Sequence, residues 1–200
     1  MRSSFPLFQS HLDLAHTYWA EIVQVGDSVI DATCGNGHDT LKLCQLVLSI
    51  DKGKVYSFDI QEQALTTTHQ YLSAHLRSNF KEQVVLQQRC HSSFPDEISP
   101  ASIKLIVYNL GYLPGGNKAK TTEGSTTLQS LKQAEKLIQP GGVISITCYS
   151  GHEEGAKEQE QILAYASRLA PKEWSCCQHI WLNRKQAPSL VLIQKAKEYQ

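Results

Sequence analysis

The chain alternates between short apolar runs and longer stretches in which apolar residues recur at helical spacing. Apolar runs bounded by turn residues predict five strands, at residues 28–34, 54–60, 84–91, 103–110 and 143–149. Helical spacing predicts helices at residues 7–23, 40–48, 61–76 and 128–138, with a further helix opening at residues 150–155. Residues 103–110 are almost continuously apolar, which is typical of a strand buried on both faces. Strands that alternate with helices in this way predict a parallel sheet covered by helices on both faces.

Two more strand-like runs, residues 174–183 and 189–196, are joined only by residues 184–188. Parallel neighbours need a crossover of about a dozen residues or more, so these two strands are expected to form an antiparallel hairpin. The predicted fold class is therefore α/β, with a seven-stranded, mostly parallel sheet that finishes in a C-terminal antiparallel hairpin. A chain of 200 residues with 41% hydrophobic content can bury one core, which favours a single domain over residues 1–200. Within it, residues 1–25 are an N-terminal helical entry segment.

Charge and cysteine content narrow the functional classes. Lys plus Arg and Asp plus Glu number 19 each, so no overall field attracts nucleic acid, and any RNA contact must use local basic patches. The six cysteines form no C-x-x-C pair, which indicates reduced thiols that act as small core residues, and no metal site is expected. The N-terminal sequence has no apolar stretch long enough for a signal peptide or a membrane span. We therefore expect a cytoplasmic protein that does not contact a membrane.

A glycine turn directly after the first predicted strand is the strongest chemical signal. The sequence DATCGNGHDT runs from Asp31 to Thr40, and Gly35 and Gly37 let the backbone turn sharply and approach a ligand without a Cβ in the way. The helix that follows leaves backbone N–H groups unpaired at its start, which suits a nucleotide-like ligand. Asp31 can take a ligand's positive charge. The residues expected to bind a cofactor here are Asp31, Thr33, Gly35, Asn36, Gly37, Asp39 and Thr40.

The next two strand ends extend this cofactor prediction. Asp59 ends the second strand, 22 residues after Gly37, where a nucleotide-binding βαβ unit holds ribose hydroxyls. The alternative is that Asp59 only caps the following helix. Ile60 and Gln61 belong to the same predicted cofactor segment. His91 and Ser92, at the end of the third strand, are expected beside the adenine ring, although an ordinary loop histidine fits the pattern equally well.

The loop after the fourth strand predicts where a substrate binds. Asn109, Leu110 and Gly111 are expected to border the cofactor, and Tyr112 and Pro114 the substrate. The Asn109 amide can accept from an amine and orient its lone pair, while the Tyr112 ring packs against a flat substrate. The alternative is a plain turn with a buried tyrosine.

Other polar residues have less specific signals. His152, at the start of a helix, is a candidate general base, or a helix-start histidine with no catalytic role. His16 either lines the mouth of the pocket or lies on the surface. Lys118, in the polar loop 117–127, can meet phosphate or simply be solvated. Arg184 and Lys185 lie at the edge of the sheet where the ligand is expected if the sixth strand is parallel to the others. Otherwise they form a surface hairpin tip.

The glycine turn, the acid after the second strand, the Asn-x-x-Tyr loop and the terminal hairpin together resemble class I S-adenosylmethionine-dependent methyltransferases, which have a Rossmann-like fold. That resemblance covers nearly the whole chain. More narrowly, three motifs, DATCGNGHDT, FDIQ and NLGYLPGGNK, are together similar to the rRNA methylase (YtqB-like) family. Characterised bacterial members are MnmM-type tRNA methyltransferases, which convert 5-aminomethyl(-2-thio)uridine at the wobble position to the methylaminomethyl form. The resemblance implies S-adenosyl-L-methionine as cofactor, a tRNA anticodon arm as partner, and a homodimer.

The sequence departs from the wider class at two places, and other functions stay open. Thr33 stands where the first glycine of D/E-x-G-x-G-x-G occurs, and Asn-Leu-Gly-Tyr replaces the Asn/Asp-Pro-Pro-Tyr of many amine methyltransferases. The alternatives are an rRNA or small-molecule methyltransferase, an NAD(P)-dependent oxidoreductase that half-matches the dinucleotide fingerprint, and a catalytically idle RNA-binding protein. The terminal hairpin argues against the oxidoreductase.

Overall fold

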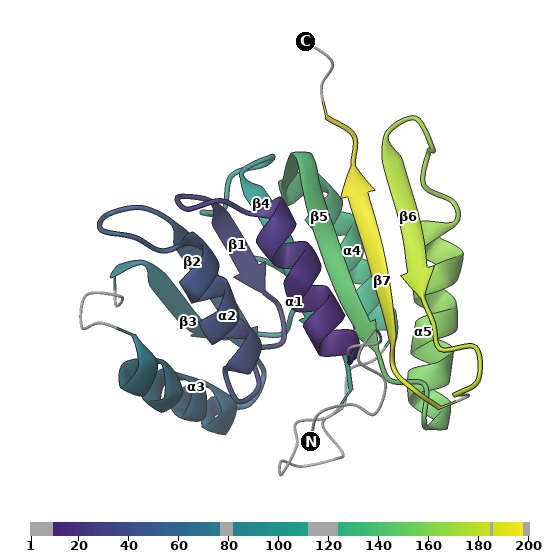
Figure 1. Cartoon of the computed structure of the whole chain (residues 1–200), viewed down its shortest axis with the longest axis horizontal. Helices are drawn as coiled ribbons and strands as arrows, with labels where there is room; N and C mark the ends of the chain where they lie inside the picture. The colour runs from purple at the N-terminus through teal and green to yellow at the C-terminus, as the bar shows by residue number, and fades with distance from the viewer. Residues whose placement is uncertain (1–9, 77–81, 112–123, 185, 198–200) are drawn as a thin grey trace.

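The protein forms a seven-stranded mixed sheet with helices packed on both of its faces (Figure 1). The computed structural model describes residues 10–76, 82–111, 124–184 and 186–197. The strands are β1 (Ser28–Asp31), β2 (Lys54–Asp59), β3 (Val84–Gln88), β4 (Ile103–Asn109), β5 (Ile138–Cys148), β6 (Trp174–His179) and β7 (Ser189–Lys195). The helices are α1 (His11–Ile22), α2 (His38–Val47), α3 (Glu62–His75), α4 (Gly124–Leu137) and α5 (Glu153–Ala166).

The pairing of the strands confirms the predicted sheet, which is mostly parallel and finishes in an antiparallel hairpin. They lie in the order β3-β2-β1-β4-β5-β7-β6, and the first five pair in parallel. β7 is antiparallel to both β5 and β6, so the predicted terminal hairpin is present. Because β6 then points the same way as β1 to β5, it ends at the same edge of the sheet as they do. We call this the carboxyl edge.

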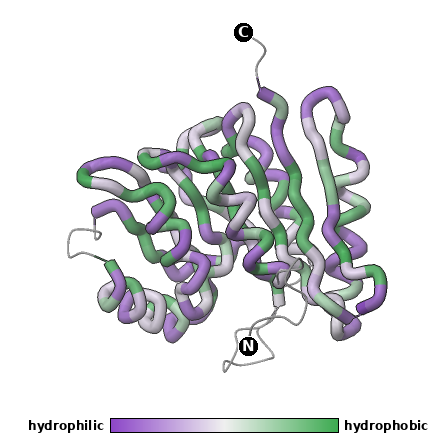
Figure 2. The backbone as a smooth tube through the Cα atoms, in the orientation of Figure 1, coloured by the Kyte–Doolittle hydropathy of each residue, from purple (hydrophilic) through white to green (hydrophobic). Residues whose placement is uncertain are grey.

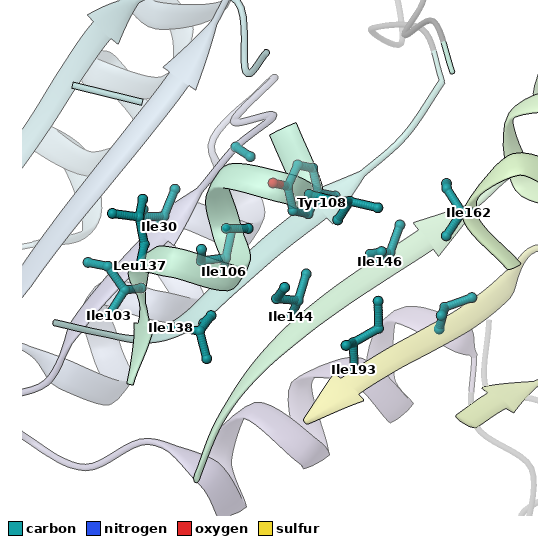
Figure 3. Close-up of a cluster of buried hydrophobic side chains, with 14 of the residues drawn as sticks. Ile30, Ile103, Ile106, Tyr108, Leu137, Ile138, Ile144, Ile146, Ile162 and Ile193 are labelled. Atoms are coloured by element: carbon teal, nitrogen blue, oxygen red, sulfur yellow. The ribbon is translucent and has the colours of Figure 1, made fainter. Parts of the chain in front are cut away.

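Two apolar layers hold the helices to the sheet. On one face, side chains of α1, α2 and α3, including Trp19, Leu43 and Leu72, pack against β1, β2, β4, β5 and β7. On the other face, α4 and α5 cover a cluster in which Tyr108 lies among isoleucines of β1, β4, β5 and β7 (Figure 3). Figure 2 shows the same arrangement, with apolar residues along the central strands and polar residues on the outer helices. Both faces of β4 are therefore buried, as its apolar sequence predicted.

Helix α1 is attached to the sheet by a buried polar contact as well as by apolar packing. The Trp19 indole nitrogen donates to the Ser145 hydroxyl of β5 at 2.9 Å, and Ala15 is fully buried. At its start, Ser10 and Asp13 form a reciprocal capping box, which satisfies backbone donors that the helix itself cannot. This docking fixes which side chains of α1 face the carboxyl edge.

Several predicted boundaries differ from the structure, and the largest effects are at helix α4 and strand β5. Helix α4 begins at Gly124, so residues 124–127 are helical and do not belong to the polar loop. Residues 140–142 lie inside β5, which begins at Ile138, and therefore do not separate a helix from a strand. A shift in register accommodates them, since Ile103 pairs with Ile138 while Leu105 pairs with Val143.

Candidate functional site

Three polar strand ends lie next to one another at the carboxyl edge. β1 lies between β2 and β4, and Asp31 pairs with Ser57 on one side and Val107 on the other. Asp59 and Asn109 are each two residues beyond those partners, at the ends of their strands. Parallel strands that end together bring residues distant in the sequence to one place, as the sequence predicted for these three.

The glycine turn packs tightly against helix α3. Gly35 and Gly37 have φ of 52° and 83°, in the region that L side chains rarely adopt, and Gly37 is the N-cap of α2. A Cβ on Gly37 would lie 3.0 Å from the Thr68 Cα, and the Thr68 hydroxyl donates to the Gly35 carbonyl at 3.0 Å. The turn thus needs glycine for its backbone conformation and for space.

Asp59 links the glycine turn to the start of α3. One carboxylate oxygen accepts from the Gly35 backbone N–H at 3.1 Å, and the other accepts from the Gln61 N–H at 2.8 Å. The second bond supports the start of the helix, as the capping alternative expected, while the first turns the carboxylate toward the glycine turn. A carboxylate at this position can accept two hydrogen bonds from a ribose.

Asp31 is buried beneath the same turn. Its carboxylate accepts from the Thr40 hydroxyl at 2.6 Å and from the Thr33 backbone N–H at 3.2 Å. Burial, and after it the charge of Asp39, raises the pKa of Asp31 to about 7. A cation next to this carboxyl would favour its ionised form, so a positively charged ligand group fits here.

A group of polar side chains connects helix α1 to the site, and we call it the edge cluster: His11, His16, Asp39, Asn109 and Tyr149. Asp39 accepts from the Asn109 side-chain amide at 3.2 Å through one oxygen and contacts the His16 imidazole Nε2 at 2.8 Å through the other. The Asn109 backbone N–H donates to the Thr33 hydroxyl at 2.8 Å. Asn109 is therefore held through both its side chain and its backbone.

Tyr149 completes the edge cluster, and the sequence analysis missed it. Its hydroxyl lies 3.2 Å from the His11 imidazole Nε2, and it also has a side-chain hydrogen bond with Asn109. Burial and then the charge of Asp39 raise the pKa of Tyr149, while the bond with Asn109 opposes that rise. Tyr149 directly follows β5, so the rule that identified Asp59 and Asn109 would also have found it. Of the two predicted positions for His16, the structure supports the one that faces the site.

His91 and Ser92 connect the end of β3 to helix α4. The His91 ring is buried, contacts Tyr108 edge to face, and lies 3.3 Å from the Thr127 hydroxyl. Burial lowers its pKa to about 4, so it is neutral at pH 7. The Ser92 carbonyl accepts from the Gln133 side chain at 2.7 Å. The predicted contact of His91 and Ser92 with a base remains a prediction, and the His91 ring is already packed in the interior.

His152 is the N-cap of α5. Its Nδ1 accepts from the Gly155 backbone N–H at 3.1 Å, and Glu154 lies 3.4 Å from the same atom. This is the geometry of the helix-start alternative, because the lone pair on Nδ1 is used by the cap. The role of general base stays a prediction for His152.

The structure describes some of the remaining predicted residues and leaves others outside its described ranges. Leu110 is buried and its N–H donates to the Thr147 carbonyl at 3.0 Å, and Gly111 follows with φ of 127°. Ile60 is 40% exposed beside Asp59, and Asn36 is partly exposed in the glycine turn. Arg184 lies at the carboxyl edge after β6. Tyr112, Pro114, Lys118 and Lys185 lie outside the described residues.

The donors and acceptors at this edge fit a nucleoside that carries a cationic group. Asp59 can accept from ribose hydroxyls, Gly37 lets the backbone turn into α2 while its Cβ position is filled by Thr68 of α3, and Asp31 can face a positive charge. Within the described ranges, no three His, Cys, Asp or Glu side chains are grouped so as to hold a metal ion. Nor does any described helix have the length and apolar content to cross a bilayer.

The strand order, the glycine turn after β1 and the acid after β2 define an S-adenosylmethionine-dependent methyltransferase of class I, as the sequence predicted. The family model described as "Putative rRNA methylase" matches residues 55–195, and the chain belongs to this family.

Solved structures agree with this assignment. The chain is similar to a protein named a putative rRNA-methylase from Clostridium thermocellum, with 34% identity and a TM-score of 0.85 over 94% of this chain and 98% of that one. It is also similar to a putative methyltransferase from Streptococcus mutans in complex with SAH, with 30% identity and a TM-score of 0.81 over 94% of this chain and 99% of the other.

A curated relative is closer in sequence. The chain is 44% identical over 188 residues to the chloroplastic tRNA (mnm(5)s(2)U34)-methyltransferase of Arabidopsis thaliana. The aligned region covers 92% of this chain and 68% of the relative. The predicted enzyme class and cofactor, S-adenosyl-L-methionine, are thereby confirmed.

Proposed function

We propose that this enzyme methylates the amine of 5-aminomethyl(-2-thio)uridine at the wobble position of tRNA. The observation that carries the proposal is the Asn109 side chain, which Asp39 holds at the carboxyl edge beside the glycine turn. Its amide nitrogen donates to Asp39, so its amide oxygen is the atom that accepts from a substrate amine. The curated relative supports this choice, because its name gives the methylated wobble nucleoside of tRNA, mnm(5)s(2)U34.

The cofactor lies along the glycine turn in this proposal. Asp59 would accept from its ribose hydroxyls, the glycine turn and the start of α2 would lie beside it, and Asp31 would face its positively charged part. When bound, S-adenosyl-L-methionine supplies a methyl group on a sulfonium, which is already a strong electrophile. The protein therefore contributes mainly position and the correct protonation state of the amine.

The edge cluster supplies both contributions. Holding a nucleophile about 3 to 3.5 Å from the reacting carbon, in line with the bond that breaks, can account for several kcal/mol of the barrier. An alkylamine is mostly protonated at neutral pH, so a group must accept its proton before or during transfer. Asp39, which accepts from the Asn109 amide, and His16, which pairs with Asp39, are the candidate acceptors of that proton.

Several partner assignments belong to the same proposal. A tRNA anticodon arm binds over the carboxyl edge, with Tyr112 and Pro114 beside the target base and Lys118, Arg184 and Lys185 toward phosphate. The active form is a homodimer. The enzyme works in the cytoplasm, whereas the plant relative is named as chloroplastic.

The test is to incubate the protein with radiolabelled S-adenosylmethionine and bulk RNA that lacks the wobble methyl group, then digest the RNA and identify the labelled nucleoside. Label in methylaminomethyl-uridine of tRNA supports the proposal. Label in rRNA supports the alternative that the family description carries, and absence of label in any RNA overturns both.

An Asp59→Ala variant tests the cofactor site separately. Its affinity for S-adenosylmethionine, measured by calorimetry, is expected to fall about tenfold to a hundredfold, because a hydrogen bond to a charged group contributes roughly 1.5–3 kcal/mol. Unchanged affinity would remove Asp59 from the site. Tighter binding of an adenine dinucleotide than of S-adenosylmethionine by the unmodified protein would favour the oxidoreductase instead.

A further inference from the structure

A pocket opens beside the edge cluster. It has a volume of about 510 Å³ and lies between the start of α1 and the connection from β6 to β7. Figure 1 shows that these two segments lie at the same end of the molecule, the carboxyl edge. The volume is within the range of about 300–1,000 Å³ that is usual for small-ligand sites.

The pocket and the edge cluster share a wall. His11 lines the pocket, and its Nε2 lies 3.2 Å from the Tyr149 hydroxyl. That hydroxyl in turn shares a hydrogen bond with the Asn109 side chain. A ligand in this pocket would therefore be the neighbour of a substrate held at Asn109.

The lining suits a flat aromatic ligand. Trp181 and Leu182 belong to it, and the Arg184 guanidinium carbon lies 4.5 Å from the centre of the Trp181 ring. Leu182 is 91% exposed and Ile180 is 56% exposed, so the pocket has an apolar rim next to a cationic one. Stacking of a nucleobase on an aromatic ring or on a guanidinium plane is the usual way in which proteins hold unpaired RNA bases.

We propose that this pocket takes one unstacked nucleobase of the RNA substrate, next in sequence to the nucleoside that is methylated. The inference rests on the proposed RNA substrate and assigns it a second contact. The Arg184 guanidinium over the Trp181 ring supports it, because a base can stack on such a plane while the cation attracts a neighbouring phosphate. A second copy of this chain, docked through Leu182 and Ile180, is the competing occupant.

Tryptophan fluorescence tests the pocket without methyl transfer. Trp19 and Trp174 are 3% and 7% exposed, whereas Trp181 is partly exposed. A short single-stranded oligoribonucleotide is therefore expected to quench the fluorescence of the full-length protein, and Trp181→Phe is expected to abolish most of that quenching. Equal quenching in Trp181→Phe and the unmodified protein would overturn the proposal, whether or not RNA is methylated.

Steady-state kinetics test the contribution to the reaction. Trp181→Ala is expected to raise KM for RNA about tenfold or more, since stacking contributes roughly 1–3 kcal/mol per base, and Trp181→Phe should restore part of it. Leu182→Ala should raise KM less, and Ile50→Ala, at a residue that is 76% exposed but distant from the edge cluster, serves as the matched control. An unchanged KM with active methylation would overturn this inference and leave the proposed function standing. A shift of sedimentation coefficient in Leu182→Ala, with KM unchanged, would assign the pocket to a subunit contact.

Discussion

The side-chain amide of Asn109 donates to the Asp39 carboxylate at 3.2 Å, although the two residues are 70 positions apart and lie on a strand and a helix. His16 contacts the other oxygen of Asp39 at 2.8 Å. The orientation of the proposed substrate-binding amide thus depends on an acid that the sequence had assigned to the cofactor.

The Asn109 contact predicts a separation of turnover from cofactor binding. Asn109→Ala should lower kcat by about a hundredfold, because misplacing a reacting group by about 1 Å can cost that much. Its affinity for S-adenosylmethionine should stay close to that of the unmodified enzyme. Asp39→Asn keeps the shape but removes the charge that Asn109 and His16 share, and should lower kcat by a smaller factor. A loss of cofactor affinity equal to the loss of turnover would contradict the role of Asn109.

Asp31 predicts that cofactor binding releases a proton. Its pKa is about 7 in the structure, and a positively charged ligand stabilises the ionised form. Affinity for S-adenosylmethionine should therefore rise as pH rises toward 7 and then level off, by roughly twentyfold between pH 5.5 and 7.5. Calorimetry at pH 6 in two buffers with different heats of ionisation measures the proton directly. Asp31→Asn should show no proton release, and the same release in that variant would exclude Asp31 as its source.

His91 predicts a loss of stability in acid. Its native pKa of about 4 is below the ordinary 6.5, so its contribution is fully present above pH 6.5 and is lost as pH falls toward 4. Between pH 7.5 and 5 this loss is about 2 kcal/mol of unfolding free energy. Asp31 acts in the opposite direction, because a raised carboxyl pKa stabilises the native state at low pH.

The comparison of variants separates the two effects. His91→Gln should be less stable than the unmodified protein at pH 7.5, yet lose less stability on acidification to pH 5, as measured by urea denaturation. His75→Gln, at an exposed histidine in the last turn of α3, is the matched control. An identical pH profile for His91→Gln and the unmodified protein would refute the assignment.

The glycine turn predicts unequal costs for two similar substitutions. Gly26 and Gly37 both have positive φ, of 102° and 83°, so alanine at either should cost about 1–2 kcal/mol in backbone strain. Only at Gly37 does the added Cβ also meet backbone, 3.0 Å from the Thr68 Cα, whereas at Gly26 the nearest atom is 3.9 Å away. Gly37→Ala should therefore be the less stable variant in thermal unfolding and should also bind the cofactor more weakly. Equal stability and affinity in both variants would show that α3 moves away from the added Cβ at little cost, and would contradict this prediction.

The strands and the terminal hairpin could be predicted because each strand is an apolar run between turn residues, and because the predicted connection between the last two strands was too short for a parallel crossover. The predicted ends of helices and strands were less accurate where local sequence signals conflict with the observed structure. Residues 124–127 read as a polar loop but continue α4, and residues 140–142 read as a break but lie within β5. In both places pairing and packing with distant segments outweigh the local preference.

The candidate site likewise contains residues that the sequence could predict and contacts that it could not. Asp31, Asp59 and Asn109 could be predicted, since ends of neighbouring parallel strands must meet. The partnership of His16 with Asp39 could not, because it depends on how α1 is rotated when Trp19 bonds to Ser145. No periodicity within the chain encodes that rotation.

The position of β7 between β5 and β6 also constrains how the protein is made. β6 emerges from the ribosome before β7, yet it joins the sheet only through β7. The pocket between the start of α1 and the β6–β7 connection therefore cannot form while synthesis has reached only β6. Assembly of that side of the molecule must wait for its last strand, so a nascent chain stalled before residue 189 would expose the edge of β5 to other polypeptides.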